Sequence, residues 1–182
     1  MAAGVRPRLA SALASVLLLT AVVACGGGDT GLGGGPPLPT SQASLSPALA
    51  GSVALLRDGL AAIGGQLFPP QAPYRPSEPV SLTQASRVVL QVQSSDPDQG
   101  FVIVYELRDV AAAEAAGREL ADYLGSGFGQ TNFPTDAQFS VAQVGATIIF
   151  TWWSADRASD REAARAAFEA IKGVGQAIPV VK

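Results

Sequence analysis

The spacing of apolar residues after position 46 predicts a helix at the start of the folded part of the chain. Apolar side chains recur there every three or four positions, which is the period of one helix face and predicts a helix of about 18 residues. The positions are Leu49, Val53, Leu56, Leu60, Ile63 and Leu67. Ser46 and Pro47 precede them and suit the N-cap and the first helical position.

Four runs rich in β-branched and aromatic residues predict strands. They span residues 87–93, 101–107, 138–144 and 146–153. The turn residues at 96–100 and Gly145 separate the members of each pair, so the runs predict two hairpins. An Ala-rich helix is expected after each hairpin, the first beginning at Asp109 and the second at a capping box formed by Ser159 and Glu162.

The order strand–strand–helix, repeated twice, predicts an α+β domain over residues 46–182. We expect a four-stranded antiparallel sheet built as two ββα units, with their two helices on one face and the N-terminal amphipathic helix on the other. The two units resemble each other in sequence. Either an internal duplication or independent convergence on Ala-rich helices explains that resemblance.

Alternation along the strands assigns side chains to the two faces of the sheet. The face toward the two later helices is expected to carry Val88, Leu90, Val92, Phe101, Ile103, Tyr105, Leu107, Phe139, Val141, Ile148, Phe150 and Trp152. The other face is expected to carry Val89, Gln91, Val102, Val104, Glu106, Ile149, Thr151 and Trp153. This second face is too apolar to meet water alone, so the first helix, a second copy of the protein or a ligand covers it.

If that face stays open, Val102, Val104 and Trp153 are the candidate binding residues. Trp152 and Trp153 are neighbours on one strand and therefore point to opposite faces. One belongs to the core. The other either packs beneath the first helix or stacks on a sugar ring or a partner protein.

Composition narrows the classes of function. The chain of 182 residues contains no His, which excludes Ser-His-Asp and Cys-His catalysis and nearly excludes a typical catalytic zinc site. Its formal net charge of −3, without a basic cluster, argues against nucleic acid as a partner. No carboxylate pair has the spacing of glycosidase chemistry, and no cofactor or metal motif is present.

The first 25 residues have the parts of a secretory signal, with Arg6 and Arg8 before an apolar run. That run, residues 9–24, falls short of the roughly 20 residues that cross a bilayer. Residues 22–25, Val-Val-Ala-Cys, resemble the lipobox of bacterial lipoproteins, although Val at the first position is less usual than Leu. The resemblance implies cleavage by signal peptidase II between Ala24 and Cys25.

The same resemblance implies a diacylglyceryl thioether on the sulfur of Cys25 and acylation, for example by palmitate, of the new amine. The alternative is an ordinary signal peptide that leaves Cys25 as an unmodified thiol. Gly26 stands where an Asp would favour inner-membrane retention, which favours the outer membrane in a cell that has one.

These features divide the chain into three parts. Residues 1–24 are the signal peptide, residues 25–45 are the lipidated Cys and a disordered Gly/Pro-rich tether, and residues 46–182 are the domain. We expect a protein held at the cell membrane or outer membrane, on the extracytoplasmic side. Its role would be noncatalytic binding or assembly with an envelope protein or a second copy. The alternative is a small hydrolase that uses carboxylates, or a Ser without His.

Overall fold

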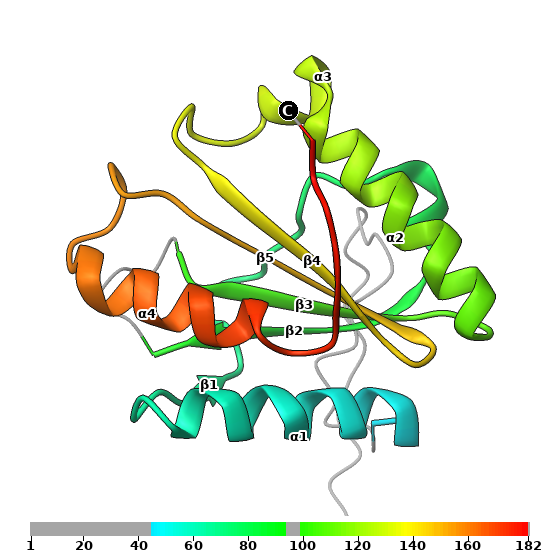
Figure 1. Ribbon diagram of the computed structural model, residues 1–182, viewed down its shortest axis with the longest axis horizontal. Coiled ribbons are helices and arrows are strands. Elements are labelled where there is room, and N and C mark those ends of the chain that lie inside the picture. The colour runs from blue at the N-terminus through cyan, green and yellow to red at the C-terminus, as the bar shows by residue number, and fades with distance from the viewer. Residues whose placement is uncertain (1–44, 94–98, 182) are drawn as a thin grey trace, which may run out of the picture. The chain divides into compact units, whose positions relative to one another are not determined.

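The computed structural model describes residues 45–93 and 99–181. The predictions for Ala24, Cys25 and the tether up to residue 44 therefore lie outside the described residues. The described part is an α+β domain in which four helices pack against a six-stranded antiparallel sheet (Figure 1). Its helices are α1 (Pro47–Ala61), α2 (Val110–Gly125), α3 (Gly127–Gln130) and α4 (Arg161–Lys172), with a 3₁₀ turn η1 (Val80–Leu82).

The strand order in the sheet is β1-β2-β3-β5-β4-β6, and every neighbouring pair is antiparallel. The strands are β1 (Leu67–Phe68), β2 (Ser86–Val92), β3 (Phe101–Glu106), β4 (Gln138–Val144), β5 (Thr147–Trp153) and β6 (Gln176–Ile178). The four predicted strands form the centre of this sheet. The short edge strands β1 and β6 were not predicted, and neither was α3. Among the described residues, no helix combines the length and apolarity needed to cross a bilayer.

Side-chain caps fix where three of the helices begin. The Ser46 hydroxyl accepts a hydrogen bond from the Leu49 amide at 3.2 Å, as predicted, and the Asp109 carboxylate accepts one from the Ala112 amide at 2.7 Å. The N-cap of α4 is Asp160, which accepts from the Ala163 amide at 3.0 Å. The prediction of Ser159 at this position is therefore wrong by one residue.

Helix α1 is shorter than its apolar pattern predicts. It ends at Ala61, and Gly64 adopts a φ of +72°, a left-handed conformation that favours glycine. Ile63 lies beyond the helix and is 47% exposed, while Leu67 belongs to β1. The first four positions of the predicted stripe are buried in the core from α1, and Leu67 packs against the same core from β1.

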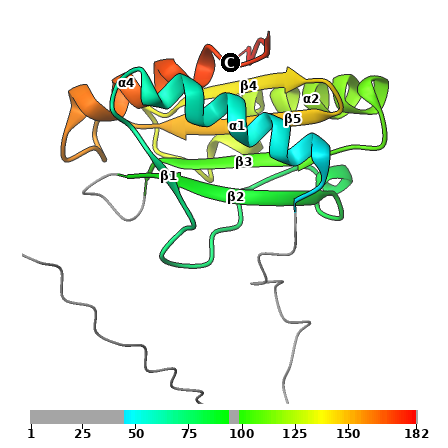
Figure 2. The same cartoon turned by 90° about the horizontal axis from the view of Figure 1, so that it is seen from below.

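The sheet separates two apolar cores, which place α1 and α4 on one face and α2 on the other (Figure 2). The α1–α4 core consists of Leu49, Val53, Leu56, Leu60, Leu90, Val92, Val102, Val104, Ile149, Ile171 and Val174. The α2 core consists of Leu82, Phe101, Ile103, Tyr105, Ala113, Ala116, Leu120, Leu124, Val141, Ile148 and Phe150. The prediction that the two later helices share a face is therefore wrong, whereas the cover of the opposite face by α1 is observed.

The register of β2 explains a second correction. Val88 lies opposite Val104 and Leu90 lies opposite Val102, and directly paired residues point to the same face. Val88, Leu90 and Val92 therefore face α1, although they were expected on the face of the later helices. Val89 packs against the α2 core instead. Alternation separates Val88, Leu90 and Val92 from Arg87, Val89 and Gln91 within β2, but the register of the β2–β3 hairpin decides which residues of β3 share their face.

The arrangement of the two ββα units bears on the proposed duplication. Strands β3 and β5, which end the two hairpins, are adjacent and antiparallel. If duplication had produced two symmetric units, a two-fold axis perpendicular to the sheet would relate β3 to β5. Rotation about that axis keeps each face of the sheet in place, so both following helices would lie on one face. Helices α2 and α4 lie on opposite faces, so the units are not related by this symmetry. The geometry favours convergence over duplication.

Glycine at position 59 lets α1 approach the end of α4. A Cβ atom there would lie 3.3 Å from Cγ2 of Val174 and 3.4 Å from the carbonyl oxygen of Ala170. The first distance is tighter than most Cβ contacts, and the second is close to an ordinary van der Waals contact. Gly59 therefore favours the close packing that holds α1 and α4 together over the sheet.

Candidate functional site

The sequence-predicted binding face lies inside the domain. Val102 and Val104 are 0% exposed, and Trp153 is 9% exposed. The valines pack in the α1–α4 core, and the Trp153 ring lies 6.2 Å from the ring of Phe168 in α4. These three side chains form interior packing and present little surface to a ligand.

A proline-rich strap, defined as residues 69–79, runs between β1 and η1 and packs on the α2 core. It contains Pro69, Pro70, Pro73, Pro76 and Pro79. Each proline fixes its own φ and lacks an amide donor, which keeps the strap extended and outside the sheet. Side chains of the strap must therefore hold it in place, and three of them do so: Tyr74, Ser77 and Glu78.

Glu78 is the most deeply buried anchor of the strap. Its side chain is 2% exposed, and its carboxylate accepts hydrogen bonds from Arg87 at 2.6 Å to both oxygens and from the Tyr105 hydroxyl at 2.7 Å. Burial and the hydrogen bond to Glu78 raise the pKa of Tyr105, which stays a protonated donor. Burial alone would lower the pKa of Arg87, but the Glu78 carboxylate outweighs it and the pKa is raised.

Tyr74 forms the middle anchor. Its ring stacks on Phe101 of β3 with centroids 3.8 Å apart and planes 4° from parallel. Its hydroxyl accepts a hydrogen bond from Nε1 of Trp152 at 3.0 Å. Burial raises the pKa of this hydroxyl more than the Trp152 bond lowers it, so the group stays protonated at physiological pH.

The opposite wall comes from the loop after α3. The Phe133 ring meets the Trp152 ring edge-on, with centroids 5.5 Å apart and planes at 71°. It also packs edge-on against Phe139, at 4.9 Å between centroids. These contacts fix the loop. The neighbouring Asn132 side chain is exposed, and its NH₂ group donates a hydrogen bond to the Phe128 carbonyl oxygen at 3.3 Å.

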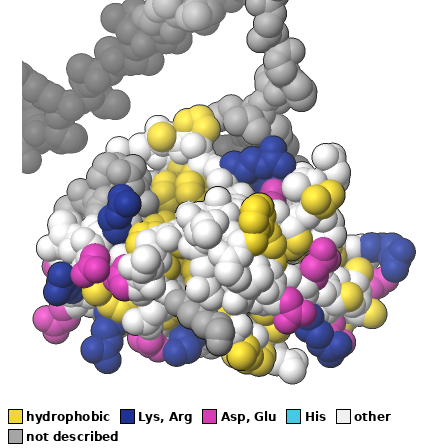
Figure 3. All heavy atoms as spheres, turned by 90° about the horizontal axis from the view of Figure 1, so that it is seen from above, with side chains coloured by type: hydrophobic (Ala, Val, Ile, Leu, Met, Phe, Trp, Pro, Cys, Tyr) yellow, Lys and Arg dark blue, Asp and Glu magenta, His cyan; other side chains and the backbone are white. Residues whose placement is uncertain are grey.

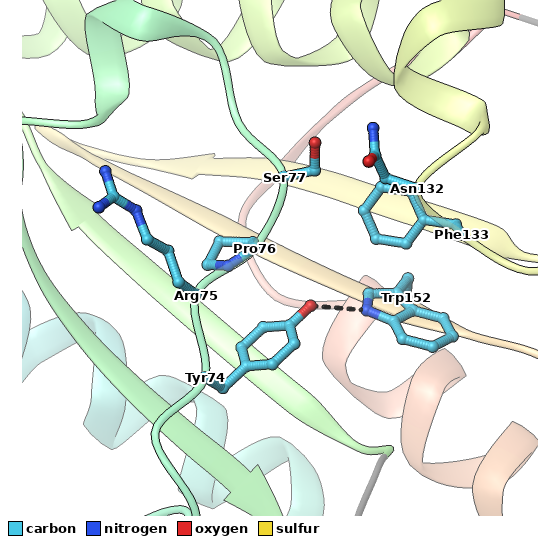
Figure 4. A pocket seen from close by; sticks show the side chains of 7 residues that line it. All are labelled: Tyr74, Arg75, Pro76, Ser77, Asn132, Phe133 and Trp152. Atoms are coloured by element: carbon cyan, nitrogen blue, oxygen red, sulfur yellow. Dashed lines mark hydrogen bonds between the residues drawn. The ribbon is translucent and has the colours of Figure 1, made fainter.

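The strap and the loop after α3 form the sides of an open pocket of about 430 Å³. It is lined by Tyr74, Arg75, Pro76, Ser77, Asn132, Phe133 and Trp152. In Figure 4 Tyr74 and Trp152 point toward one another across it, and Arg75 extends away at its margin. The volume lies within the range of roughly 300–1,000 Å³ that is usual for small-molecule sites.

The chemistry of the pocket suits binding. Its lining combines three aromatic rings with hydroxyl, amide and guanidinium groups, and no Asp, Glu, His or Cys occurs among the lining residues that are described. The nearest buried carboxylate, Glu78, is bonded to Arg87 and Tyr105. Within residues 45–93 and 99–181, no three His, Cys, Asp or Glu side chains are grouped to hold a metal ion.

Exposed apolar side chains occur outside the pocket as well. Figure 3 shows hydrophobic side chains in separate groups on one face, with charged side chains mostly toward its margin. The most exposed large ones in the described structure are Val80, Val181 and Phe128, at 84%, 78% and 74%. They come from η1, the C-terminal segment and α3, and no single element gathers them.

Sequence reasoning singled out one pocket residue, Trp152, and missed the others. Trp152 turns to the pocket and Trp153 to the core, which confirms that the adjacent tryptophans point to opposite faces. Tyr74 and Phe133 gave one usable signal: each is an aromatic residue beside proline in a stretch without strand or helix periodicity. Such a ring must pack on an element elsewhere in the chain or face solvent.

Comparisons with known proteins give no assignment. No family model, no curated protein and no solved structure matches this chain.

Proposed function

We propose that the protein is a lipid-anchored extracytoplasmic lipoprotein that acts as a noncatalytic binding domain at the cell envelope. The observation that carries this proposal is the sequence of residues 22–25, Val-Val-Ala-Cys, at the end of a short apolar run. A single Cys in a chain with a secretory signal is explained if its thiol carries a lipid.

The anchor and the tether together define how the domain would work. Each buried CH₂ of an acyl chain contributes about 0.8 kcal/mol, so two or three chains hold the protein firmly where a single chain does not. A coil of about 20 residues spans roughly 25 Å on average. The domain would stay close to the membrane and remain free to reach a ligand or a partner.

The pocket supports a binding role for the domain. Aromatic walls with a few neutral hydrogen-bonding groups are typical of ligand sites. The strap that forms one wall is held by the ion pair of Glu78 with Arg87 and by the Tyr74–Phe101 stack. A wall held in this way needs little ordering when a ligand binds, which favours affinity.

The change Cys25→Ser tests the anchor. Serine keeps the size of the side chain and removes the thiol, the soft nucleophile that accepts the diacylglyceryl group. In cells supplied with labelled palmitate, we expect the wild-type protein to be labelled and shortened by its signal peptide. The variant should stay unlabelled and keep the precursor length.

Gly26→Ala is the matched control, since it changes the adjacent residue and leaves the lipobox intact. It should be labelled and processed like the wild type. Equal labelling of the Cys25→Ser variant, or absence of label from the wild type, would refute the proposed anchor.

A further inference from the structure

The pocket combines aromatic rings with groups that both donate and accept hydrogen bonds. Trp152 and Phe133 are half-buried, so each leaves part of its ring surface accessible. Tyr74, Asn132 and Ser77 add two hydroxyls and one amide around these rings. Each of these groups already has one partner within the protein, and an apolar ligand would leave their remaining hydrogen-bonding capacity unused. A small ion would leave the rings unused. The lining fits a ligand that has both an apolar face and a polar rim.

The polar groups keep hydrogen-bonding capacity for a ligand. The Tyr74 hydroxyl accepts from Trp152, so its own hydrogen can be donated outward. In the described structure the Asn132 side chain makes one hydrogen bond, which its NH₂ group donates to a carbonyl oxygen at 3.3 Å. Its carbonyl oxygen and second N–H remain for a ligand. A side-chain amide with both functions exposed pairs well with another amide.

The charge of the lining restricts the ligand further. Of the lining residues that the structure describes, Arg75 alone is ionic; its side chain is 67% exposed and lies 3.6 Å from the Glu78 carboxylate. Among the described lining residues there is no carboxylate, so a cationic ligand would gain cation–π contact with the rings but no ion pair, and it would meet the like charge of Arg75. This balance of charges favours neutral and acidic ligands.

The walls are fixed before a ligand arrives. Tyr74 is stacked on Phe101 of β3, Trp152 belongs to β5, and Phe133 is packed against Trp152 and Phe139. The strap and strand β5 meet here through two side chains, Tyr74 and Trp152, that are 78 positions apart in the chain. Rigid aromatic walls of this kind suit a rigid ring better than a flexible chain, because neither partner then loses much conformational entropy.

We propose that this pocket binds a saccharide ring carrying an amide, that is, an N-acetylated amino sugar of a glycan. The apolar face of the sugar packs on Trp152 and Phe133, its hydroxyls bond to Tyr74, and its acetamido group pairs with the Asn132 amide. The inference names the ligand class of the binding role proposed above and rests on that role.

The test uses the full-length protein purified from membranes in detergent, titrated by calorimetry with chitotriose, a trimer of β-1,4-linked N-acetylglucosamine. Cellotriose, the same backbone without acetamido groups, is the chemical control. A proline-rich peptide is a third ligand, since aromatic grooves also accept polyproline segments. We expect saturable binding of chitotriose, weaker binding of cellotriose and no binding of the peptide.

Two variants locate the binding. Asn132→Ala should weaken chitotriose binding about fivefold, in line with one neutral hydrogen bond, and leave cellotriose binding unchanged. Trp152→Phe should weaken both by about tenfold through the smaller ring. Arg57→Ala, an exposed change on α1 across the sheet, is the control and should bind like the wild type. Melting temperatures show whether each variant is folded.

Three outcomes would overturn the inference. They are the absence of saccharide binding, chitotriose binding that both pocket variants leave unchanged, and binding of the peptide alone. Palmitate labelling of the same preparation separates this inference from the proposed anchor. A labelled protein that binds no saccharide loses the ligand class and keeps the anchor, whereas an unlabelled protein that binds chitotriose loses the anchor and keeps the pocket.

Discussion

Replacing Glu78 with Ala is expected to lower the free energy of unfolding by about 3–5 kcal/mol, the usual cost of removing one partner from a buried ion pair. The substitution leaves Arg87, whose side chain is 21% exposed, without its carboxylate, and it leaves the fully buried Tyr105 hydroxyl without its acceptor. Urea unfolding followed by circular dichroism measures the change.

Glu114→Ala provides the matched control for Glu78. Glu114 pairs with Arg118 on the surface of α2, where both side chains are more than half exposed. Exposed pairs contribute about 0–1 kcal/mol, so this variant should unfold close to the wild type. Equal losses for the two glutamate variants would contradict the role of Glu78 as the buried anchor of the strap.

Leu56→Ala is expected to cost about 2–5 kcal/mol, the range for large-to-small changes in a packed core. Leu56 is 0% exposed and joins α1 to the strand residues Val102 and Val104. If α1 is the permanent cover of this face, truncation of Leu56 leaves a cavity beneath the helix. Thermal unfolding by calorimetry measures the loss.

The substitution Leu55→Ala is the matched control, because it makes the same change in helix propensity without removing a buried side chain. It lies on the same helix but is 47% exposed, so Leu55→Ala should change stability by about 0.5 kcal/mol or less. Small effects for both leucines would show that α1 does not close the sheet face. Concentration-dependent dimerisation in the Leu56→Ala variant alone would agree with an uncovered apolar face.

The three longer helices and the central strands were predictable because their periodicity is local, whereas α3, with four residues, is too short to show a period. The steps of four, three and four residues from Leu49 to Leu60 mark the buried side of α1, and the carboxylate of Asp109 marks the start of α2. Strands β1 and β6 contain two and three residues, too few to show any period. Their existence depends on the neighbouring strands to which they pair.

The side of the sheet taken by each helix could not be predicted, and the reason is physical. Strand β3 is buried along Phe101–Tyr105 and β5 is apolar on both faces, so alternation does not distinguish core from solvent. The register of β2, set by pairs such as Leu90 with Val102, decides which face its side chains take. That register is a property of the folded sheet.

The pocket was beyond sequence reasoning for the same reason. Tyr74 and Trp152 belong to segments without any shared local pattern, and their hydrogen bond exists only after strap and sheet have packed. Proline spacing predicts that the strap is extended, but its path over the α2 core depends on Glu78 reaching Arg87 and Tyr105. The residues of such a site can be identified only from the contacts that they make in the folded structure.

Mass spectrometry of the N-terminal peptide from the purified mature protein tests the proposed anchor most directly. The proposal predicts that the peptide begins at Cys25 and carries a diacylglyceryl group on its sulfur. A peptide with an unmodified thiol at residue 25, or a chain that still begins at Met1, would contradict it.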